Sequence, residues 1–231
     1  MSSSRWYRAA IILLSFFLPL TIAAQQNAPA SAQAYPEDAR ELPGMPGYRF
    51  AWGLNDQSFI THLLVYHNGH KVQALDLCRG NEPIQPSGDI GALTTADFNF
   101  DNSPDAAMLV SEQGEKKFYC VWLFNPQTQQ FVPSEQLSQI PNPAPDPQTK
   151  TVVSTVQQDC AGGCFEQNVY AWASGRLKPV SSIQQTLDLA VPPTVDCRFV
   201  RIVKQERNGR LVETSRNTVD TAGNPCYLPQ R

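Results

Sequence analysis

Apolar side chains recur at every second position over most of this chain. Short runs rich in aromatic and β-branched residues are separated by turn residues, a pattern that predicts half-buried β-strands. The pairs Asn68-Gly69 and Asn208-Gly209 predict tight hairpins, because both central residues of a type I′ turn need positive φ. The expected strands are Tyr48–Gly53, Ile60–Tyr66, Lys71–Leu77, Ala106–Ser111, Phe118–Phe124, Thr151–Val156, Val169–Ala173, Leu177–Val180, Arg198–Gln205 and Leu211–Ser215.

This pattern predicts a single all-β antiparallel domain over residues 47–231. A sandwich, a barrel or propeller-like blades all fit, since the period alone does not separate them. Only Ser182–Leu189 could form a short helix. The Pro-rich stretch Pro133–Pro147 is either a linker between domains or a long surface loop. We favour the loop, because the strand pattern resumes unchanged after it.

The N-terminal residues have the features of a targeting segment. Arg5 and Arg8 form a basic region, Ala9–Leu18 is apolar, and Ile22-Ala23-Ala24 is a small-residue cleavage signal. The apolar run is shorter than the about 20 residues of a membrane span. We therefore expect a signal peptide at 1–24, no membrane anchor, and a periplasmic or secreted protein.

After the signal peptide, residues 25–46 are rich in Ala, Gln and Pro and poor in large apolar side chains. Such a segment buries too little apolar surface to offset the entropy of ordering it. We expect a flexible leader here, with the folded region starting near Gly47.

Six cysteines lie in the exported part of the chain, at Cys78, Cys120, Cys160, Cys164, Cys197 and Cys226. In an oxidising compartment an even number favours disulfides over metal or redox chemistry. Six cysteines allow 15 pairings, which the sequence alone leaves open. The strand order favours Cys78–Cys120, Cys160–Cys164 and Cys197–Cys226.

Charge and motifs argue against several functions. The formal net charge is −3, and loss of the signal peptide with its two arginines makes it −5. No Lys/Arg excess exists to bind nucleic acid. Nucleophile-elbow, zinc-protease and phosphate-loop motifs are also missing from the sequence, so we expect no enzyme.

One loop, Asp97–Asp105, suggests metal chemistry. Acidic or amide side chains stand at its positions 1, 3, 5 and 9, and calcium takes six to eight oxygen ligands. The alternative is an Asx-turn, in which these side chains only cap backbone amides. We favour structural calcium, because three close aspartates repel one another unless a cation neutralises them. The expected ligands are Asp97, Asn99, Asp101, Asp105 and the backbone carbonyl of Ser103.

The residues between these ligands fit such a loop. Asn102 stands where a sharp turn usually needs Gly, and Asn tolerates the left-handed region. Phe98 and Phe100 are expected to pin the loop to the core. A helical EF-hand is excluded, because its twelfth position is Met108 instead of Glu.

Here the sequence resembles a known group. The run D-F-N-F-D-x-x-x-D before an apolar strand is similar to the loop of FG-GAP and VCBS-type β repeats. Thr94–Val180 resembles bacterial periplasmic inhibitors of lysozyme-like enzymes, a group that includes PliI-type inhibitors and immunity proteins against peptidoglycan-cleaving effectors. The matching runs are Leu123–Phe131, with L-F-N-P-x-T-x-x-F, and Val169–Leu177, with V-Y-x-W-x-x-G-x-L.

The resemblance implies a calcium-stabilised, propeller-like domain that pushes a loop into the cleft of a lysozyme-like peptidoglycan hydrolase. The chain departs from the Ser-Gly-x-x-Tyr signature of some members, because Ser174-Gly175 is followed by Arg176, Leu177 and Lys178. The inhibitory contact therefore has to be sought elsewhere.

The best candidate for that contact is the segment Gln157–Gln167. Cys160 and Cys164 would close a small ring in which Gly162 and Gly163 permit a protruding turn, with Phe165 as an anchor. The ring would equally serve to brace a hairpin corner. We expect an exported inhibitor or immunity protein; the alternative is a calcium-stabilised secreted binding or adhesion module without inhibitory activity.

Overall fold

The computed structural model describes residues 35–78, 80, 82–158, 160, 162–191, 198–224 and 226. All of these belong to one compact unit, Gln33–Arg231. The expected signal peptide lies outside the described residues, as does Cys197. Within the described ranges, no helix has the length and apolar character needed to cross a membrane.

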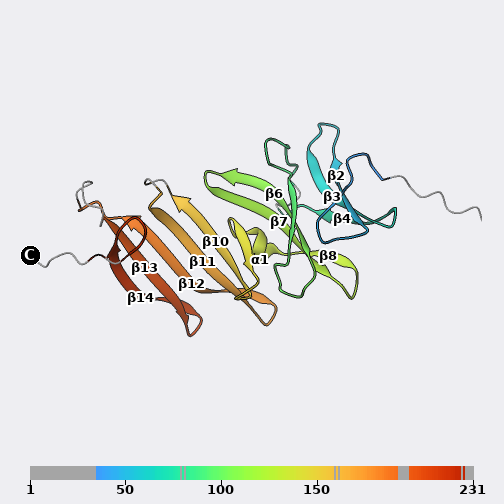
Figure 1. Ribbon diagram of the computed structural model, residues 1–231. Coiled ribbons are helices and arrows are strands. Elements are labelled where there is room, and N and C mark those ends of the chain that lie inside the picture. The colour runs from blue at the N-terminus through green and yellow to red at the C-terminus, as the bar shows by residue number, and fades with distance from the viewer. Residues whose placement is uncertain are drawn as a thin grey trace, which may run out of the picture. The chain divides into compact units, whose positions relative to one another are not determined.

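The fold is almost entirely β, in three antiparallel sheets (Figure 1), which confirms the expected class. Neither a closed barrel nor a closed propeller is formed by these sheets in the described part of the chain. The first sheet is a meander whose strand order follows the sequence. It contains β1 (Arg40–Glu41), β2 (Tyr48–Leu54), β3 (Ile60–His67) and β4 (His70–Asp76).

The second sheet is also a sequential meander, followed by one short helix. It contains β5 (Leu93–Ala96), β6 (Asp105–Gln113), β7 (Lys116–Asn125) and β8 (Gln130–Pro133), and α1 (Glu135–Ser138) comes next.

The third sheet has six strands in the order β14-β13-β12-β11-β10-β9. Its members are β9 (Pro143–Asp146), β10 (Thr151–Gln158), β11 (Cys164–Ala173), β12 (Arg176–Leu187), β13 (Phe199–Arg207) and β14 (Arg210–Val219).

Both expected Asn-Gly hairpins are present. Asn68 and Gly69 have φ of 50° and 86°, and Asn208 and Gly209 have 53° and 81°. Positive φ at both central residues is what a type I′ turn requires, so the local signal correctly placed the turns between β3 and β4 and between β13 and β14.

The second sheet is buried on both faces. Successive residues of β6 alternate, so that Ala106 and Met108 join a cluster with the first sheet, whereas Ala107 joins a cluster with the third sheet. The residues of β7 alternate in the same way: Trp122 packs in the cluster with the first sheet, and Val121 packs in the cluster with the third sheet. Burial on both faces explains the unbroken apolar run Ala106–Val110 within β6.

A side chain also joins the first two sheets. Gln73 of β4 donates from Nε2 to the carbonyl of Phe131 (2.8 Å) and accepts from the Phe131 amide (2.9 Å). The amide group thus forms the two hydrogen bonds of a ladder between β4 and β8.

The folded region begins earlier than expected, so the interpretation of 25–46 as wholly flexible is wrong for its last part. Leu42 and Met45 are buried in the first cluster, and the Tyr35 hydroxyl accepts a hydrogen bond from Gly69 N (2.7 Å). The segment is held by these two side chains, by the Tyr35 hydroxyl and by the pairing of β1 with β2, and the core that receives Leu42 and Met45 is formed by other strands.

Two further expectations are corrected. Pro133–Pro147 is not a structureless loop, since it contains α1 and β9. β9 tolerates Pro143 and Pro145 because it is an edge strand and pairs on one side only. Within the possible helix at Ser182–Leu189, residues 182–187 instead form the second half of β12, which ends at Leu187.

Candidate functional site

The aspartate-rich loop connects β5 to β6 and is anchored by its aromatic residues. Phe98 is buried, and Phe100 packs against the same cluster between the second and third sheets. Asn102 has φ of 67°. The expected roles of all three residues are therefore confirmed, and Phe100 also has a positive φ, of 61°, which its side chain did not suggest.

The first polar side chains of the loop turn toward its own backbone. The Asp97 carboxylate accepts hydrogen bonds from the amides of Asp101 (3.2 Å) and Asn102 (2.9 Å). Asn99 Oδ1 also accepts from the Asp101 amide (3.2 Å), and Asp101 Oδ1 accepts from Ser103 N (2.8 Å). These are the contacts of nested Asx-turns, and they gather the oxygens of Asp97, Asn99 and Asp101 around one short piece of backbone.

Asp105 behaves differently, because its side chain is fully buried. One carboxylate oxygen accepts from Phe98 N (2.7 Å) and the other from Phe124 N (2.8 Å). Burial raises the pKa of Asp105 to about 7, although these two hydrogen bonds lower it and the nearby charges of Asp101 and Asp97 raise it further. Asp105 thus clamps the loop to β7.

Among the described residues, no group of three or more His, Cys, Asp or Glu side chains is placed to hold a metal ion. A calcium site here would need the amide oxygen of Asn99 and the carbonyl of Ser103 as well. Oxygen donors of this kind are those that calcium prefers. Asp97, Asn99 and Asp101 fit that chemistry and are at least partly exposed, although their oxygens also accept backbone amides of the loop. Asp105 differs in being fully buried.

Two of the three expected disulfides are confirmed: Cys78–Cys120 and Cys160–Cys164. Cys226 is disulfide-bonded, and Cys197 lies outside the described residues. Cys160–Cys164 closes the connection between β10 and β11. We call the segment Cys160–Cys164 the disulfide turn.

The two glycines of the disulfide turn have different surroundings. Gly162 has φ of 81°, and a Cβ built on it would meet no atom within 4 Å. Gly163 is buried against Phe199, whose ring carbon Cζ would lie only 2.4 Å from such a Cβ. The tip of the turn therefore faces open space while its base is fixed.

Phe165, the expected anchor, follows the turn on β11 and is half-buried. The Arg201 guanidinium lies 5.8 Å from the centre of its ring. Tyr170 and Trp172, further along β11, are partly buried and pack against the cluster between the second and third sheets. The Trp172 indole N–H also donates to the Phe98 carbonyl (2.8 Å), which ties β11 to the aspartate-rich loop.

Gln185, a residue not predicted from the sequence, is 1% exposed and lies beneath the disulfide turn. Its Nε2 donates to the Gly163 carbonyl (2.7 Å). A signal for it did exist, because Ile183, Gln185 and Leu187 alternate on one face of β12. This face was not recognised, because a helix was considered there and a helix has a different side-chain period.

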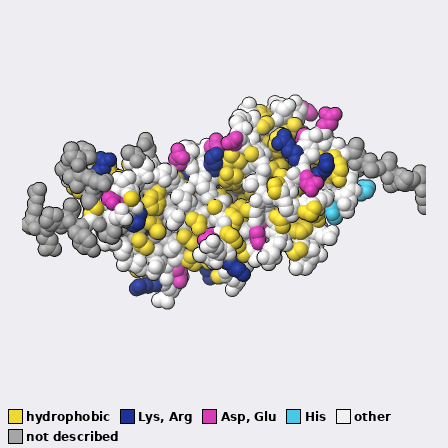
Figure 2. Space-filling model, in the orientation of Figure 1, with side chains coloured by type: hydrophobic (Ala, Val, Ile, Leu, Met, Phe, Trp, Pro, Cys, Tyr) yellow, Lys and Arg dark blue, Asp and Glu magenta, His cyan; other side chains and the backbone are white. Residues whose placement is uncertain are grey.

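Charged side chains of both signs are scattered over the face seen in Figure 2, without a patch of one sign. This distribution offers no extended basic surface on that face.

No protein-family model matches the chain, and no curated protein sequence is significantly similar to it. Among solved structures, the chain is similar to a Xanthomonas type IV secretion system related protein. The TM-score is 0.54 at 14% identity, and the match covers 77% of this chain and 92% of that chain. At this identity the likeness shows a shared fold.

Proposed function

We propose that this chain is an exported inhibitor or immunity protein that blocks a lysozyme-like peptidoglycan hydrolase by inserting the disulfide turn into its active-site cleft. The observation that supports this most is the contrast within the turn. Gly163 is fixed against Phe199, while Gly162 at the tip faces open space. A turn that is already ordered loses little entropy on binding, which is a general route to tight inhibition.

The setting of the protein supports the same proposal. Disulfides persist in oxidising compartments such as the periplasm, and the neighbour of similar fold is related to a secretion system. The charge of −5 expected for the exported chain would also steer it toward a basic enzyme.

Calcium is the proposed cofactor, with a structural role. Asp97, Asn99 and Asp101 would supply side-chain oxygens, and Ser103 its carbonyl, while Asp105 would hold the loop to β7. Bound calcium would neutralise the carboxylates and stiffen the loop. Metal analysis by mass spectrometry of protein purified without chelator tests this directly.

The function is tested by the lysis of peptidoglycan by a lysozyme-type enzyme, with and without the protein. The wild type should suppress lysis at near-stoichiometric ratio. Gly162→Trp places a large side chain at the tip and should raise the inhibition constant at least tenfold.

Gly209→Trp is the matched control. Gly209 has the same φ of 81° and also has open space around a built Cβ, but it lies in the hairpin between β13 and β14. The Gly209→Trp variant should inhibit lysis as well as the wild type does. If the wild type leaves lysis untouched and instead binds a cell surface or glycan, the protein is a binding or adhesion module.

A further inference from the structure

Two turns at one end of the third sheet are held by the same pair of side chains. One is the disulfide turn, and the other follows β14 and spans Asp220–Asn224; we call it the C-terminal turn. From β12, Gln185 donates to the carbonyl of Gly163 (2.7 Å) in the first turn and to the carbonyl of Thr221 (3.4 Å) in the second.

Arg201 of β13 completes the connection. Its Nε donates to Gln185 Oε1 (2.9 Å), and its Nη1 donates to the Gly223 carbonyl (3.0 Å). A Cβ built on Gly223 would lie 1.8 Å from Arg201 Nη2, so only glycine allows this approach. On the other side, the guanidinium lies over Phe165, which directly follows the disulfide turn.

We infer that the C-terminal turn is the second half of the partner-binding surface, and that Gln185 and Arg201 are the positioning residues that join the two turns into one rigid edge. This inference rests on the proposed function. Each turn has an exposed residue at its tip, Gly162 in one and Ala222 in the other.

The chemistry of the C-terminal turn suits the cleft of a sugar-cleaving enzyme. Asp220 and Asn224 are joined by a side-chain hydrogen bond of 2.8 Å, and both belong to the solvent-exposed part of the turn. Carboxylate and amide groups can bond to the polar groups with which such a cleft binds sugar hydroxyls. The two turns together, which we call the composite edge, would therefore fill the cleft with the disulfide turn, which packs on Phe199, and with the polar C-terminal turn.

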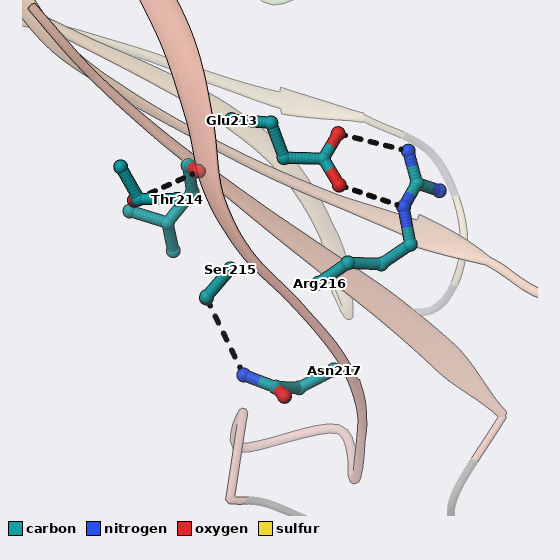
Figure 3. Close-up of polar contacts among 6 residues, drawn as sticks. Glu213, Thr214, Ser215, Arg216 and Asn217 are labelled. Carbon is teal, nitrogen blue, oxygen red and sulfur yellow. Dashed lines mark hydrogen bonds and ion pairs between the residues drawn. The ribbon is translucent and has the colours of Figure 1, made fainter.

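A second arginine supplies the matched control. Arg216 of β14 makes two hydrogen bonds of 3.0 Å to the Glu213 carboxylate, as Figure 3 shows. Its side chain is 58% exposed, and these contacts stay within β14. Losing Arg216 should therefore leave both turns in place.

Hydrogen exchange of the free protein tests the coupling without any target enzyme. Arg201→Met should speed amide exchange at least tenfold at Gly163 and at Gly223, whereas Arg216→Met should change neither. Gln185→Glu keeps an acceptor for Arg201 but removes the donor to both turns, and it should loosen both. Loosening of one turn alone would overturn the coupling.

The partner-binding role is tested with the wild type and two tip variants. In the complex with a lysozyme-type enzyme, both turns of the wild type should be protected from exchange, and Ala222→Trp should weaken inhibition about as much as Gly162→Trp. Protection of the disulfide turn alone, with full inhibition by Ala222→Trp, would refute the composite edge and leave the proposed function standing. If the wild type does not inhibit at all, the proposed function fails, and the exchange data still decide whether the turns are coupled.

Discussion

The aspartate-rich loop and the disulfide turn are both surface connections, yet they are held in opposite ways. Asp97, Asn99 and Asp101 bond to amides no more than five residues away. The base of the disulfide turn is instead fixed by Gln185 and Phe199, which lie on two other strands. The conformation of the polar part of the aspartate-rich loop is thus fixed by contacts within the loop, whereas that of the disulfide turn is fixed by contacts with the sheet.

This difference matters for function. A self-capped loop such as Asp97–Asp105 can keep its conformation at many places on a protein, so its natural use is as a structural brace. A turn fixed from below can expose its tip, and a Cβ on Gly162 would meet no atom within 4 Å, although the Gly162 carbonyl accepts a hydrogen bond from Gln157 Nε2 (2.7 Å). This side of the tip is open to a partner.

Asp105 is the exception in the first loop, and its removal should have the largest effect. Asp105→Ala leaves the buried amide of Phe98 and the partly buried amide of Phe124 without an acceptor, which should cost about 2–6 kcal/mol at roughly 1–3 kcal/mol for each amide. Denaturant unfolding measures this loss. Asp101→Ala, in the exposed part of the same loop, should cost below about 1 kcal/mol; equal losses would show that the clamp to β7 is not what holds the loop.

Calcium should stabilise the aspartate-rich loop and leave the disulfide turn unchanged. At a free calcium concentration 100 times the dissociation constant, binding to the native state adds about 2.7 kcal/mol, so chelation should lower the melting temperature. The variant Asp97→Ala/Asp101→Ala should lose this response. A melting curve that is insensitive to chelator and calcium would remove the metal from the account, although the Asx-turns would remain.

The sequence was informative where structure is local. The Asn-Gly hairpins follow from the two residues that form them, and the packing of Phe98 and Phe100 follows from their alternation with polar residues. The disulfide pairs Cys78–Cys120 and Cys160–Cys164 follow from the order of the strands.

Long-range register could not be read from the chain. Gln73 meets Phe131 across 58 residues of sequence, and Gln185 meets Arg201 only because β12 and β13 pair in one register. A glutamine has the same appearance in a sequence whether it lies in solvent or replaces part of a β-ladder. The docking of Leu42 and Met45 was missed for the same reason, since their environment is supplied by other strands.

A change at Gly163 tests the disulfide turn and should have an effect of intermediate size on stability. Gly163→Ala places a methyl group against the Phe199 ring, and overpacking of this kind costs about 1–3 kcal/mol. Phe199→Leu in the same chain should recover part of the loss by making room, which a double-mutant cycle measures. Additive losses would mean that the turn and Phe199 are not in contact in solution.

The smallest effect concerns Asp220 of the C-terminal turn, whose pKa moves in the direction opposite to that of Asp105. The pKa of Asp220 lies below its ordinary value, chiefly because of a hydrogen bond from the Asn224 side chain. Hydrogen bonds from the backbone amides of Asn224, Gly223 and Ala222 lower it as well, and together they outweigh a weaker opposing effect of burial. A carboxyl whose folded-state pKa is lowered adds stability above its unfolded pKa, near 4, and loses it as the pH falls through the folded pKa. The C-terminal turn should therefore loosen only below about pH 4.

NMR titration of the Asp220 carboxyl tests this assignment. The pKa of Asp220 should rise in Asn224→Ala and stay in place in Asn217→Ala, a control on β14. An unchanged pKa in Asn224→Ala would show that the Asn224 side chain does not hold this turn.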